Sequence, residues 1–396
     1  MANGEAAALA ADRVRPEGDS TIPVFDLRFD DDDLEAVADT LRSGWLTLGP
    51  RTAALEDAFA QHLGAKHAVA VSNCTAALHL AYLAAGLGPG DEVIVPSFTF
   101  AATAASALYT GATPVFADII GPENPSLDPA DVERKLTGKT KAVVLVHFGG
   151  YAGRVDELKA LCDRNGVQLL EDCAHVPSAS FHGKKLGTFG LAGAFSFFSN
   201  KVLAVGEGGM LVTDDDEVAE FARSRRSHAM TAGTWQKHTG HSDSYDVVGL
   251  GFNYRIDEPR SALLLSRLSK LEADIEQRRR LTYRYREALR DIPGLVVPFR
   301  DEDVPESSCY VMAVFLDDPA LQGPFRRALL EQHGIQTSMF YPSVHLFSAY
   351  REVAAGVGLP RTELASRTEV TLPLFTHMTD GQVDRVVAAI RTELHA

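Results

Sequence analysis

The chain has 396 residues and a net charge of −15, with 38 basic against 53 acidic side chains and 45% hydrophobic residues. This length suggests two domains, the mixed composition argues against wholesale disorder, and the acidic balance disfavours nucleic acid as a general partner, because duplex binding depends on Lys and Arg. The four cysteines are too few for a disulfide framework, which predicts a reducing, cytoplasmic location.

Residues 1–21 are Ala-rich but interrupted by charges, and they are predicted to form a flexible tail and not a signal peptide. Asp30 to Asp33 follow, and this acid run is expected to complement the dipole of a helix start. Residues 93–117 contain no charged side chain, which raises the hypothesis of a membrane span. Pro96 and Gly111 interrupt the stretch, so a buried strand, a small-residue helix and a second strand fit better. No membrane association is expected.

Apolar strand-like segments alternate with helix-like segments from residue 67 onward. The expected strands are 67–71, 92–96, 114–118, 142–148, 167–171, 193–198 and 210–213. Near-continuous apolar strands that alternate with helices predict a mostly parallel sheet covered on both faces. The loop between the last two strands is too short for a helical crossover.

The last third of the chain has a different pattern. Apolar residues from Leu268 to Leu289 approximate a 3.6-residue period, which predicts one long surface helix. Arg278, Arg279 and Arg280 lie within it and are expected to form a solvated face. Short strands and helices after residue 293 suggest a compact α+β unit. The domain boundary is therefore placed near residue 265, which gives a large domain, 22–265, and a small domain, 266–396.

One buried strand ends in a group of potentially reactive side chains, Glu171, Asp172, Cys173 and His175. Functional groups gather at the carboxyl ends of parallel strands, so Asp172 lies where a site is expected. A metal site built from all four is disfavoured, because strand alternation sends successive side chains to opposite faces. The alternative for Asp172 is a turn cap.

Lys201 directly follows an aromatic apolar strand and precedes the glycine-rich turn 206–209. Lysine rarely enters an apolar region without compensation. A desolvated lysine has a lowered pKa and can act as an amine nucleophile that forms a Schiff base with a carbonyl. The alternative is a loop lysine whose amine reaches solvent.

A third element, residues 72–75, has the sequence Ser-Asn-Cys-Thr and lies between a strand and a helix. Its small side chains leave the first helical amides free to face an anion, although a simple helix cap is the alternative. An anion cradle, a strand-end carboxylate and an enclosed lysine are together the groups that pyridoxal 5′-phosphate (PLP) requires. They would bind its phosphate, its pyridine nitrogen and its aldehyde.

From about residue 22 to its end, the sequence resembles the DegT/DnrJ/EryC1/StrS sugar aminotransferases, which are PLP enzymes of fold type I. The matching stretches are 43–50 (SGWLTLGP), 72–80 (SNCTAALHL), 88–103 (GPGDEVIVPSFTFAAT), 171–175 (EDCAH), 196–201 (SFFSNK), 206–212 (GEGGMLV), 253–258 (NYRIDE) and 341–345 (YPSVH). The resemblance implies a large PLP domain with a mostly parallel seven-stranded sheet, a smaller C-terminal α+β domain and a homodimer.

The resemblance also implies roles for individual cofactor-site residues. Lys201 would be the Schiff-base lysine and proton shuttle, and Asp172 would pair with the pyridine nitrogen. Phe100 would stack on the cofactor, although a core phenylalanine is the alternative. His175 would lie near the phenolic oxygen of the cofactor.

The phosphate site and the substrate channel are implied in the same way. Ser196 would hold the phosphate together with the amides around Cys74 and Thr75. Asn253 would reach the phosphate from the neighbouring subunit. The resemblance also assigns channel-lining positions to the 43–50 loop, with Trp45 and Thr47, and to Tyr341 and His345.

A basic group around Trp235 is a separate hypothesis for substrate binding. Lys237 and His238 are expected to meet the diphosphate of a nucleotide-linked sugar, with a solvated loop as the alternative. No metal is expected to take part.

The function implied is a transamination from an amino acid, expected to be L-glutamate, to a nucleotide-linked keto sugar. His175 and the stretch 147–150 resemble members that aminate C4, so a dTDP-4-keto-6-deoxyhexose in amino-sugar biosynthesis is the expected substrate. The alternatives are a 3-keto sugar or a cyclitol of the scyllo-inosose type. A catalytically silent binding or regulatory protein on the same scaffold is a third possibility.

Overall fold

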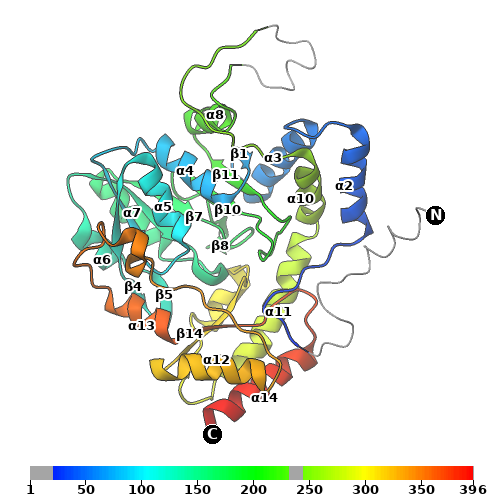
Figure 1. Cartoon of the computed structure of the whole chain (residues 1–396), viewed down its shortest axis with the longest axis vertical. Helices are drawn as coiled ribbons and strands as arrows, with labels where there is room; N and C mark the ends of the chain where they lie inside the picture. Colours follow the sequence, from blue (N-terminus) through cyan, green and yellow to red (C-terminus); the bar gives the residue numbers. More distant parts are fainter. Residues whose placement is uncertain (1–20, 232–243, 396) are drawn as a thin grey trace.

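The computed structural model describes residues 21–231 and 244–395, and a seven-stranded sheet lies at its centre (Figure 1). In spatial order the strands are β1 (His67–Val71), β11 (Gly209–Thr213), β10 (Ala192–Ser196), β7 (Gln168–Asp172), β6 (Thr140–Val146), β2 (Glu92–Pro96) and β3 (Thr113–Ala117). β11 pairs antiparallel with both β1 and β10, whereas the other pairs are parallel. The carboxyl ends of these other strands therefore meet at one edge. The predicted mostly parallel α/β fold is confirmed.

Helices cover both faces of this sheet (Figure 1). They are α3 (Pro50–Leu63), α4 (Cys74–Ala84), α5 (Ala101–Thr110), α6 (Pro129–Lys135), α7 (Val155–Asn165), α8 (Asp216–Arg225) and α10 (Glu258–Leu268). In β1, Ala68 and Ala70 belong to the core beneath α3 and α7, whereas Val69 and Val71 belong to the core beneath α4 and α5. Because every second side chain enters a different core, the strands are apolar throughout.

The acid run and the uncharged stretch take the predicted forms. α2 (Asp31–Ser43) begins with a capping box between Asp30 and Asp33, which satisfies two backbone amides at its start. The uncharged stretch forms β2, α5 and β3. Within the described ranges, no helix combines the length and the apolar character needed to cross a bilayer.

The C-terminal part builds a second core around an antiparallel sheet. This sheet contains β12 (Leu295–Val296), β13 (Met312–Leu316) and β14 (Glu369–Leu372), and it packs with α11 (Leu271–Leu289), α12 (Gln322–Glu331) and α14 (Asp380–His395). Two antiparallel ribbons, β4 (Ile119–Gly121) with β5 (Asn124–Leu127) and β8 (Ser180–Phe181) with β9 (Lys184–Lys185), complete the strands. The N-terminal segment joins this part, because Ile22 pairs with Ile335.

The expectation that the arginine run of α11 is a solvated face is wrong for two of its members. Arg278 lies on the buried stripe of the helix, and its guanidinium donates to the carbonyls of Cys309, Tyr310 and Leu374 at 2.9, 2.7 and 3.1 Å. Arg279 donates to the carbonyl of Ser307 at 2.8 Å, and only 17% of its side chain is exposed. Arg280 alone matches the expectation, because it reaches Asp380 at the surface. Carbonyl acceptors supplied by distant segments make the burial of these charges possible.

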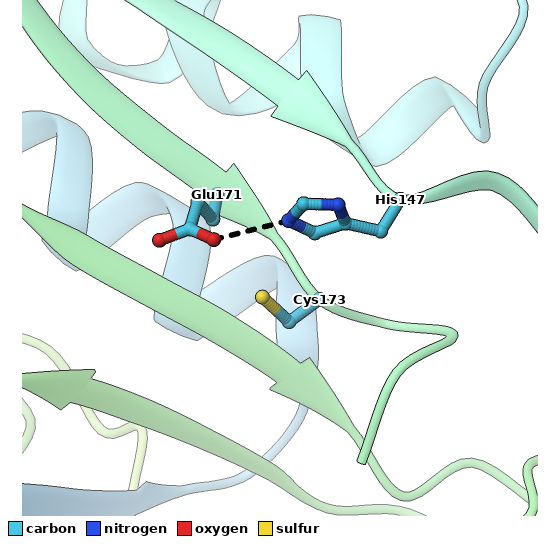
Figure 2. Close-up of side chains that lie close together, drawn as sticks. All are labelled: His147, Glu171 and Cys173. Carbon is cyan, nitrogen blue, oxygen red and sulfur yellow. Dashed lines mark hydrogen bonds and ion pairs between the residues drawn. The ribbon is translucent and has the colours of Figure 1, made fainter. Parts of the chain in front are cut away.

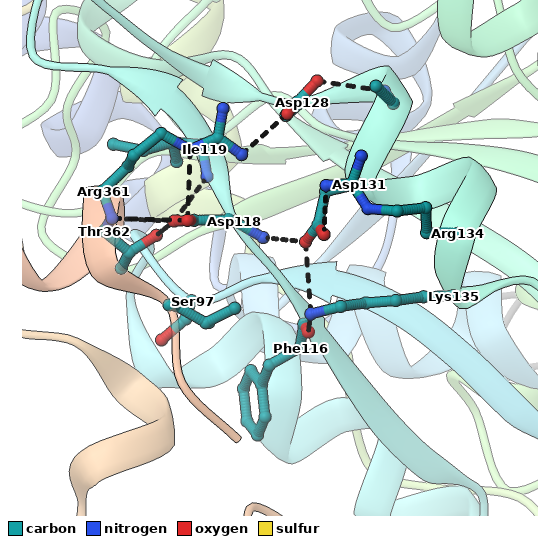
Figure 3. Close-up of polar contacts among 12 residues, drawn as sticks. Ser97, Phe116, Asp118, Ile119, Asp128, Asp131, Arg134, Lys135, Arg361 and Thr362 are labelled. Carbon is teal, nitrogen blue, oxygen red and sulfur yellow. Dashed lines mark hydrogen bonds and ion pairs between the residues drawn. The ribbon is translucent and has the colours of Figure 1, made fainter.

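A group of hydrogen bonds and ion pairs joins the C-terminal part to the large sheet (Figure 3). Asp118, which follows β3, accepts hydrogen bonds from the amide and hydroxyl of Thr362 at 2.8 and 2.7 Å, at the start of α13 (Pro360–Thr368). Arg361 reaches Asp128 at 2.7 Å. These contacts hold the start of α13 against the edge of the large sheet.

Candidate active site

A cavity of about 620 Å³ opens where the carboxyl ends of the parallel strands meet. Its lining contains most of the residues predicted to bind the cofactor: Cys74, Thr75, Phe100, Asp172, His175, Ser196 and Lys201. They come from α4, from the segment between β2 and α5, from β7, from β10 and from the turns that follow. The topology of the sheet thus brings distant motifs into one site.

Lys201 lies in the turn after β10, with its amine enclosed by the cavity wall. Its Nζ donates to the phenol oxygen of Tyr310 at 3.3 Å and lies 4.4 Å from the centroid of that ring. Burial lowers the pKa of the Lys201 amine to about 8, although the Asp172 carboxylate partly offsets this effect. An amine with such a pKa can both accept and release a proton near neutral pH.

Asp172 ends β7 and is buried. Its Oδ2 accepts from the Thr103 hydroxyl at 2.8 Å, and its Oδ1 accepts from the amide of Ala174 at 3.1 Å. Burial raises the pKa of the Asp172 carboxyl, which these two hydrogen bonds oppose. The carboxylate therefore has two neutral donors, and a cation placed at its open side would favour its ionised form.

The start of α4 forms an anion cradle. The Asn73 side chain accepts from the amide of Ala76 at 2.9 Å, whereas the amides of Cys74 and Thr75 have no intrahelical partner. Gly209 on β11 allows the close approach of this turn, because a Cβ there would lie 2.3 Å from the carbonyl carbon of Asn73. Ser196, at the end of β10, brings its hydroxyl to the same cavity. Free amides and the helix dipole favour a bound anion.

His175 is held in one tautomer. Its Nδ1 accepts from the amide of Gly149 at 3.2 Å, so Nε2 carries the proton and donates to the Tyr341 hydroxyl at 2.8 Å. Burial lowers the pKa of His175 well below its usual range, which keeps the ring neutral. The Tyr341 hydroxyl accepts this bond and retains its own proton for a group in the cavity.

Phe100 precedes α5, and 63% of its surface is exposed to the cavity and its mouth. Its ring centroid lies 6.3 Å from that of Tyr341. An exposed aromatic ring beside a buried carboxylate and an amine is a stacking surface for a planar ligand and does not belong to the core.

The four residues considered as a metal set are divided between two sides of β7. Figure 2 shows Glu171, His147 and Cys173 close together on one side, and their ligand-type atoms lie within 4.8 Å of one another. Glu171 accepts from His147 Nε2 at 3.0 Å and from the amides of Gly187 and Phe189 at 2.8 and 2.7 Å. These donors occupy its lone pairs, so Glu171 anchors the loop after β9. Asp172 and His175 face the cavity instead.

The cavity residues fit PLP. The amides of α4 and Ser196 suit the phosphate, Phe100 suits the face of the ring, and Asp172 suits a protonated pyridine nitrogen. Lys201 offers an amine of lowered pKa to the aldehyde. Each group of the cofactor thus has a complementary partner.

Several predicted residues lie elsewhere in the described chain. Trp45 and Thr47 are on the 43–50 loop, where Trp45 Nε1 donates to the carbonyl of Leu48 at 3.3 Å, and neither is among the residues that line the cavity. His345 is buried against Ser97 at 2.7 Å, also outside this lining. Asn253 is exposed and bridges to Ser227.

The other residues predicted to bind substrate are Tyr341, Lys237 and His238. Tyr341 lines the cavity. Lys237 and His238 lie outside the described residues.

Three residues were not anticipated from the sequence: Asn200 and Tyr310, which line the cavity, and Thr103, which is buried and donates to Asp172. The sequence gives a weak indication for Thr103, because it lies four residues after Thr99. In the structure the two hydroxyls are 2.8 Å apart. Tyr310 carries none, because its contact with Lys201 spans 109 positions of the chain.

Comparisons with known proteins identify the family of this chain. The sequence profile of the DegT/DnrJ/EryC1/StrS aminotransferase family matches residues 28–391. The chain is 39% identical to the spore coat polysaccharide biosynthesis protein SpsC of Bacillus subtilis, over 91% of this chain and 94% of SpsC.

Two solved structures are similar over most of their length. DesV of S. venezuelae, in complex with a ketimine intermediate, has 33% identity and a TM-score of 0.87, covering 95% of this chain and 99% of DesV. NtdA of Bacillus subtilis, with bound cofactor PMP, has 25% identity and a TM-score of 0.83, covering 93% and 83%. The chain belongs to the DegT/DnrJ/EryC1/StrS family and is a PLP-dependent sugar aminotransferase.

Proposed function

We propose that this enzyme moves an amino group from L-glutamate to C4 of a dTDP-linked 4-keto-6-deoxyhexose, with Lys201 and Asp172 as its catalytic residues. The observation that carries the proposal is that the Lys201 amine and the Asp172 carboxylate line one cavity beside an anion cradle. When bound, PLP supplies an aldehyde that exchanges with amino groups and a ring that delocalises electrons.

Lys201 carries the proton. Its Nζ, with a pKa of about 8, accepts a proton from the carbon that loses it and returns that proton to the acceptor atom in the same half-reaction. Enclosure of the amine keeps water from competing for this transfer.

Asp172 holds a positive charge in place. Thr103 and the Ala174 amide fix its two oxygens, so the carboxylate points to one position in the cavity. A negative charge fixed by neutral donors in a buried site stabilises a partner cation more strongly than one in water. Phe100, Ser196 and the amides of Cys74 and Thr75 hold the ring and the phosphate.

Neutral His175 is assigned to the phenolic oxygen of the cofactor, and Tyr341, which it contacts, to the sugar. The Tyr341 proton is available to a carbonyl or hydroxyl oxygen of a sugar. We assign the diphosphate to Lys237 and His238, and the outer channel to the 43–50 loop with Trp45 and Thr47. His345 stays the least supported of these substrate residues, because it is buried against Ser97.

We also propose that the enzyme is a homodimer in which Asn253 reaches the cofactor phosphate of the partner. Apolar side chains are exposed on the chain just before Asn253 and in the lining of the cavity: Leu250 is 90% exposed, Val248 63% and Phe198 44%. Such a surface favours association with a second copy.

We further propose a cytoplasmic location. The described cysteines are all free thiols, which supports this location.

The test is an assay of purified holoenzyme with glutamate and a panel of keto substrates. The panel contains dTDP- and UDP-linked 4-keto-6-deoxyhexoses, a 3-keto isomer and a keto cyclitol. We expect the highest kcat/KM with the dTDP-4-keto sugar and nuclear magnetic resonance signals of an amine at C4. A preference for the 3-keto sugar or the cyclitol would overturn the C4 assignment. A protein that gives no spectral change with any amino donor would instead be a binding protein.

A further inference from the structure

Tyr310 lies directly beneath the proposed proton carrier. Lys201 Nζ donates to Tyr310 Oη at 3.3 Å, and the same nitrogen lies 4.4 Å from the centroid of the ring. The Tyr310 hydroxyl in turn donates to Oδ1 of Asn200 at 3.1 Å. Because its own proton points to Asn200, the lone pairs of Oη are left for the amine.

We propose that Tyr310 is a positioning residue for Lys201: its phenol oxygen accepts a hydrogen bond from the free amine and thereby directs the lone pair of Nζ into the cavity. The proposal rests on the proposed role of Lys201. It concerns the free amine, which is the form of Lys201 that accepts a proton.

Tyr310 does not carry the proton itself. Burial raises the pKa of the Tyr310 phenol far above its usual range, and its proton is engaged with Asn200. The hydroxyl therefore stays protonated wherever the enzyme works. Its contribution is the fixed position of an acceptor atom.

The main chain and the neighbouring rings make that position rigid. The amide of Tyr310 donates to the carbonyl of Gly149 at 2.9 Å, and its carbonyl accepts from buried Arg278 at 2.7 Å. The ring of His175 packs on that of Tyr310, with centroids 4.3 Å apart. A Cβ at Gly150 would lie 2.7 Å from the nitrogen of Tyr310, so this close approach of the two segments requires glycine at position 150.

The charges around Lys201 determine how its pKa should change when the Tyr310 hydroxyl is removed. The Asp172 carboxylate favours the ammonium form, whereas burial disfavours it, and His175 is neutral. An acceptor oxygen binds an ammonium more strongly than an amine. Removal of Oη should therefore lower the pKa of Lys201 and increase the neutral fraction. If Oη acted only on the charge of Lys201, its removal would not slow proton abstraction, because more of the amine would be neutral. If Oη positions the amine, its removal would slow this step.

The first experiment compares Tyr310→Phe with wild-type holoenzyme. The variant keeps the ring and loses only Oη. We expect kcat to fall between about tenfold and a hundredfold, because misplacement of a reacting group has effects of this size. We expect KM for both substrates and the melting temperature to stay near the wild-type values. The matched control is Tyr285→Phe, since the Tyr285 hydroxyl contacts only the sulfur of Met378, at 4.0 Å, among the described residues.

The second experiment reads the amine without turnover. Holoenzyme is converted to its pyridoxamine form, in which Lys201 is free, and is labelled with acetic anhydride across pH. Mass spectrometry then follows the peptide that contains residue 201. We expect the labelling midpoint to be lower for Tyr310→Phe than for wild type and unchanged for Tyr285→Phe.

An unchanged midpoint together with a wild-type kcat in Tyr310→Phe would overturn the proposal. A lower midpoint with an undiminished kcat would also overturn it, because Tyr310 would then act on charge alone. Failure of the role of Lys201 is distinguishable, because borohydride would then fix the cofactor to a residue other than 201.

Discussion

The hydroxyl of Thr103 donates a hydrogen bond of 2.8 Å to Oδ2 of Asp172, and both side chains are buried. Thr103 lies on α5 and Asp172 at the end of β7, so the bond joins two elements that are 69 positions apart. A donor to a carboxylate favours its ionised form and opposes the effect of burial on the pKa of Asp172. Thr103 therefore helps to keep the proposed partner of the pyridine nitrogen charged.

Replacement of Thr103 by valine tests this relationship. Thr103→Val conserves shape but removes the donor, and a hydrogen bond to a charged group contributes about 1.5 kcal/mol or more. We expect PLP affinity of the apoenzyme and kcat each to fall about tenfold, measured by absorbance titration and steady-state kinetics. Thr103→Ser keeps the hydroxyl and should stay close to wild type. Equal losses in the two variants would indicate a packing role.

Replacement of Lys201 by alanine should abolish turnover and leave PLP binding through the phosphate measurable. We expect kcat to fall at least about a thousandfold, because no other amine in the cavity lining replaces Nζ among the described residues. Borohydride reduction followed by peptide mass spectrometry should fix the cofactor to residue 201 in wild type only. Normal turnover of the variant would exclude Lys201 from the mechanism.

Asp172→Asn should damage catalysis nearly as much. The variant is isosteric but lacks the negative charge that holds a protonated pyridine nitrogen, so we expect kcat to fall between about 10² and 10³-fold. The melting temperature of the apoenzyme serves as the control for folding. A mild loss of rate would instead favour a turn-capping role.

The raised pKa of Glu369 predicts how the stability of the fold depends on pH. This residue is buried on β14, where it accepts from the amide of Phe340 at 2.8 Å and the hydroxyl of Thr371 at 2.6 Å, and burial raises its pKa from 4.5 to about 8. The folded state therefore favours the protonated acid. Its stabilising contribution is complete below about pH 4.5 and is lost as the pH rises towards about 8.

Glu369→Gln imitates the protonated acid at every pH. We expect the apoenzyme of this variant to melt a few degrees above wild type at about pH 9, and the difference to shrink to near zero at about pH 5. Scanning calorimetry across this range measures the difference. A constant difference at all pH values would show that Glu369 is ionised throughout.

Arg278 is a buried cation whose guanidinium donates to main-chain carbonyls. Arg278→Met would leave the carbonyls of Cys309, Tyr310 and Leu374 without this donor, and we expect a loss of about 3 kcal/mol or more in the free energy of unfolding. Arg280→Ala, at the exposed end of the same run, should change it by about 0.5 kcal/mol or less. Urea denaturation compares the two. Similar losses would contradict the burial of Arg278.

The local sequence pattern was sufficient to predict the strands of the central sheet and the direction of the side chains at their ends. The positions of the seven strands of the central sheet follow from apolar runs and turns, and the direction of Asp172 and Glu171 to opposite sides follows from alternation alone. The same reasoning failed for Arg278, because a charged residue on an otherwise apolar helical stripe can be buried only if acceptors arrive from elsewhere. Those acceptors lie 31 to 96 positions away along the chain.

The order of residues by itself determined the α/β architecture and the place of Asp172 at the end of a strand, because each depends on short-range periodicity. The anion cradle and the catalytic roles of Lys201 and Asp172 stay predictions. Only the tertiary structure decided that Tyr310 accepts a hydrogen bond from Lys201, that Thr103 donates to Asp172 and that His345 is buried against Ser97. These contacts depend on how strands and helices pack across the sheet. Such packing sums many weak contacts over the whole chain, and no local stretch of sequence contains it.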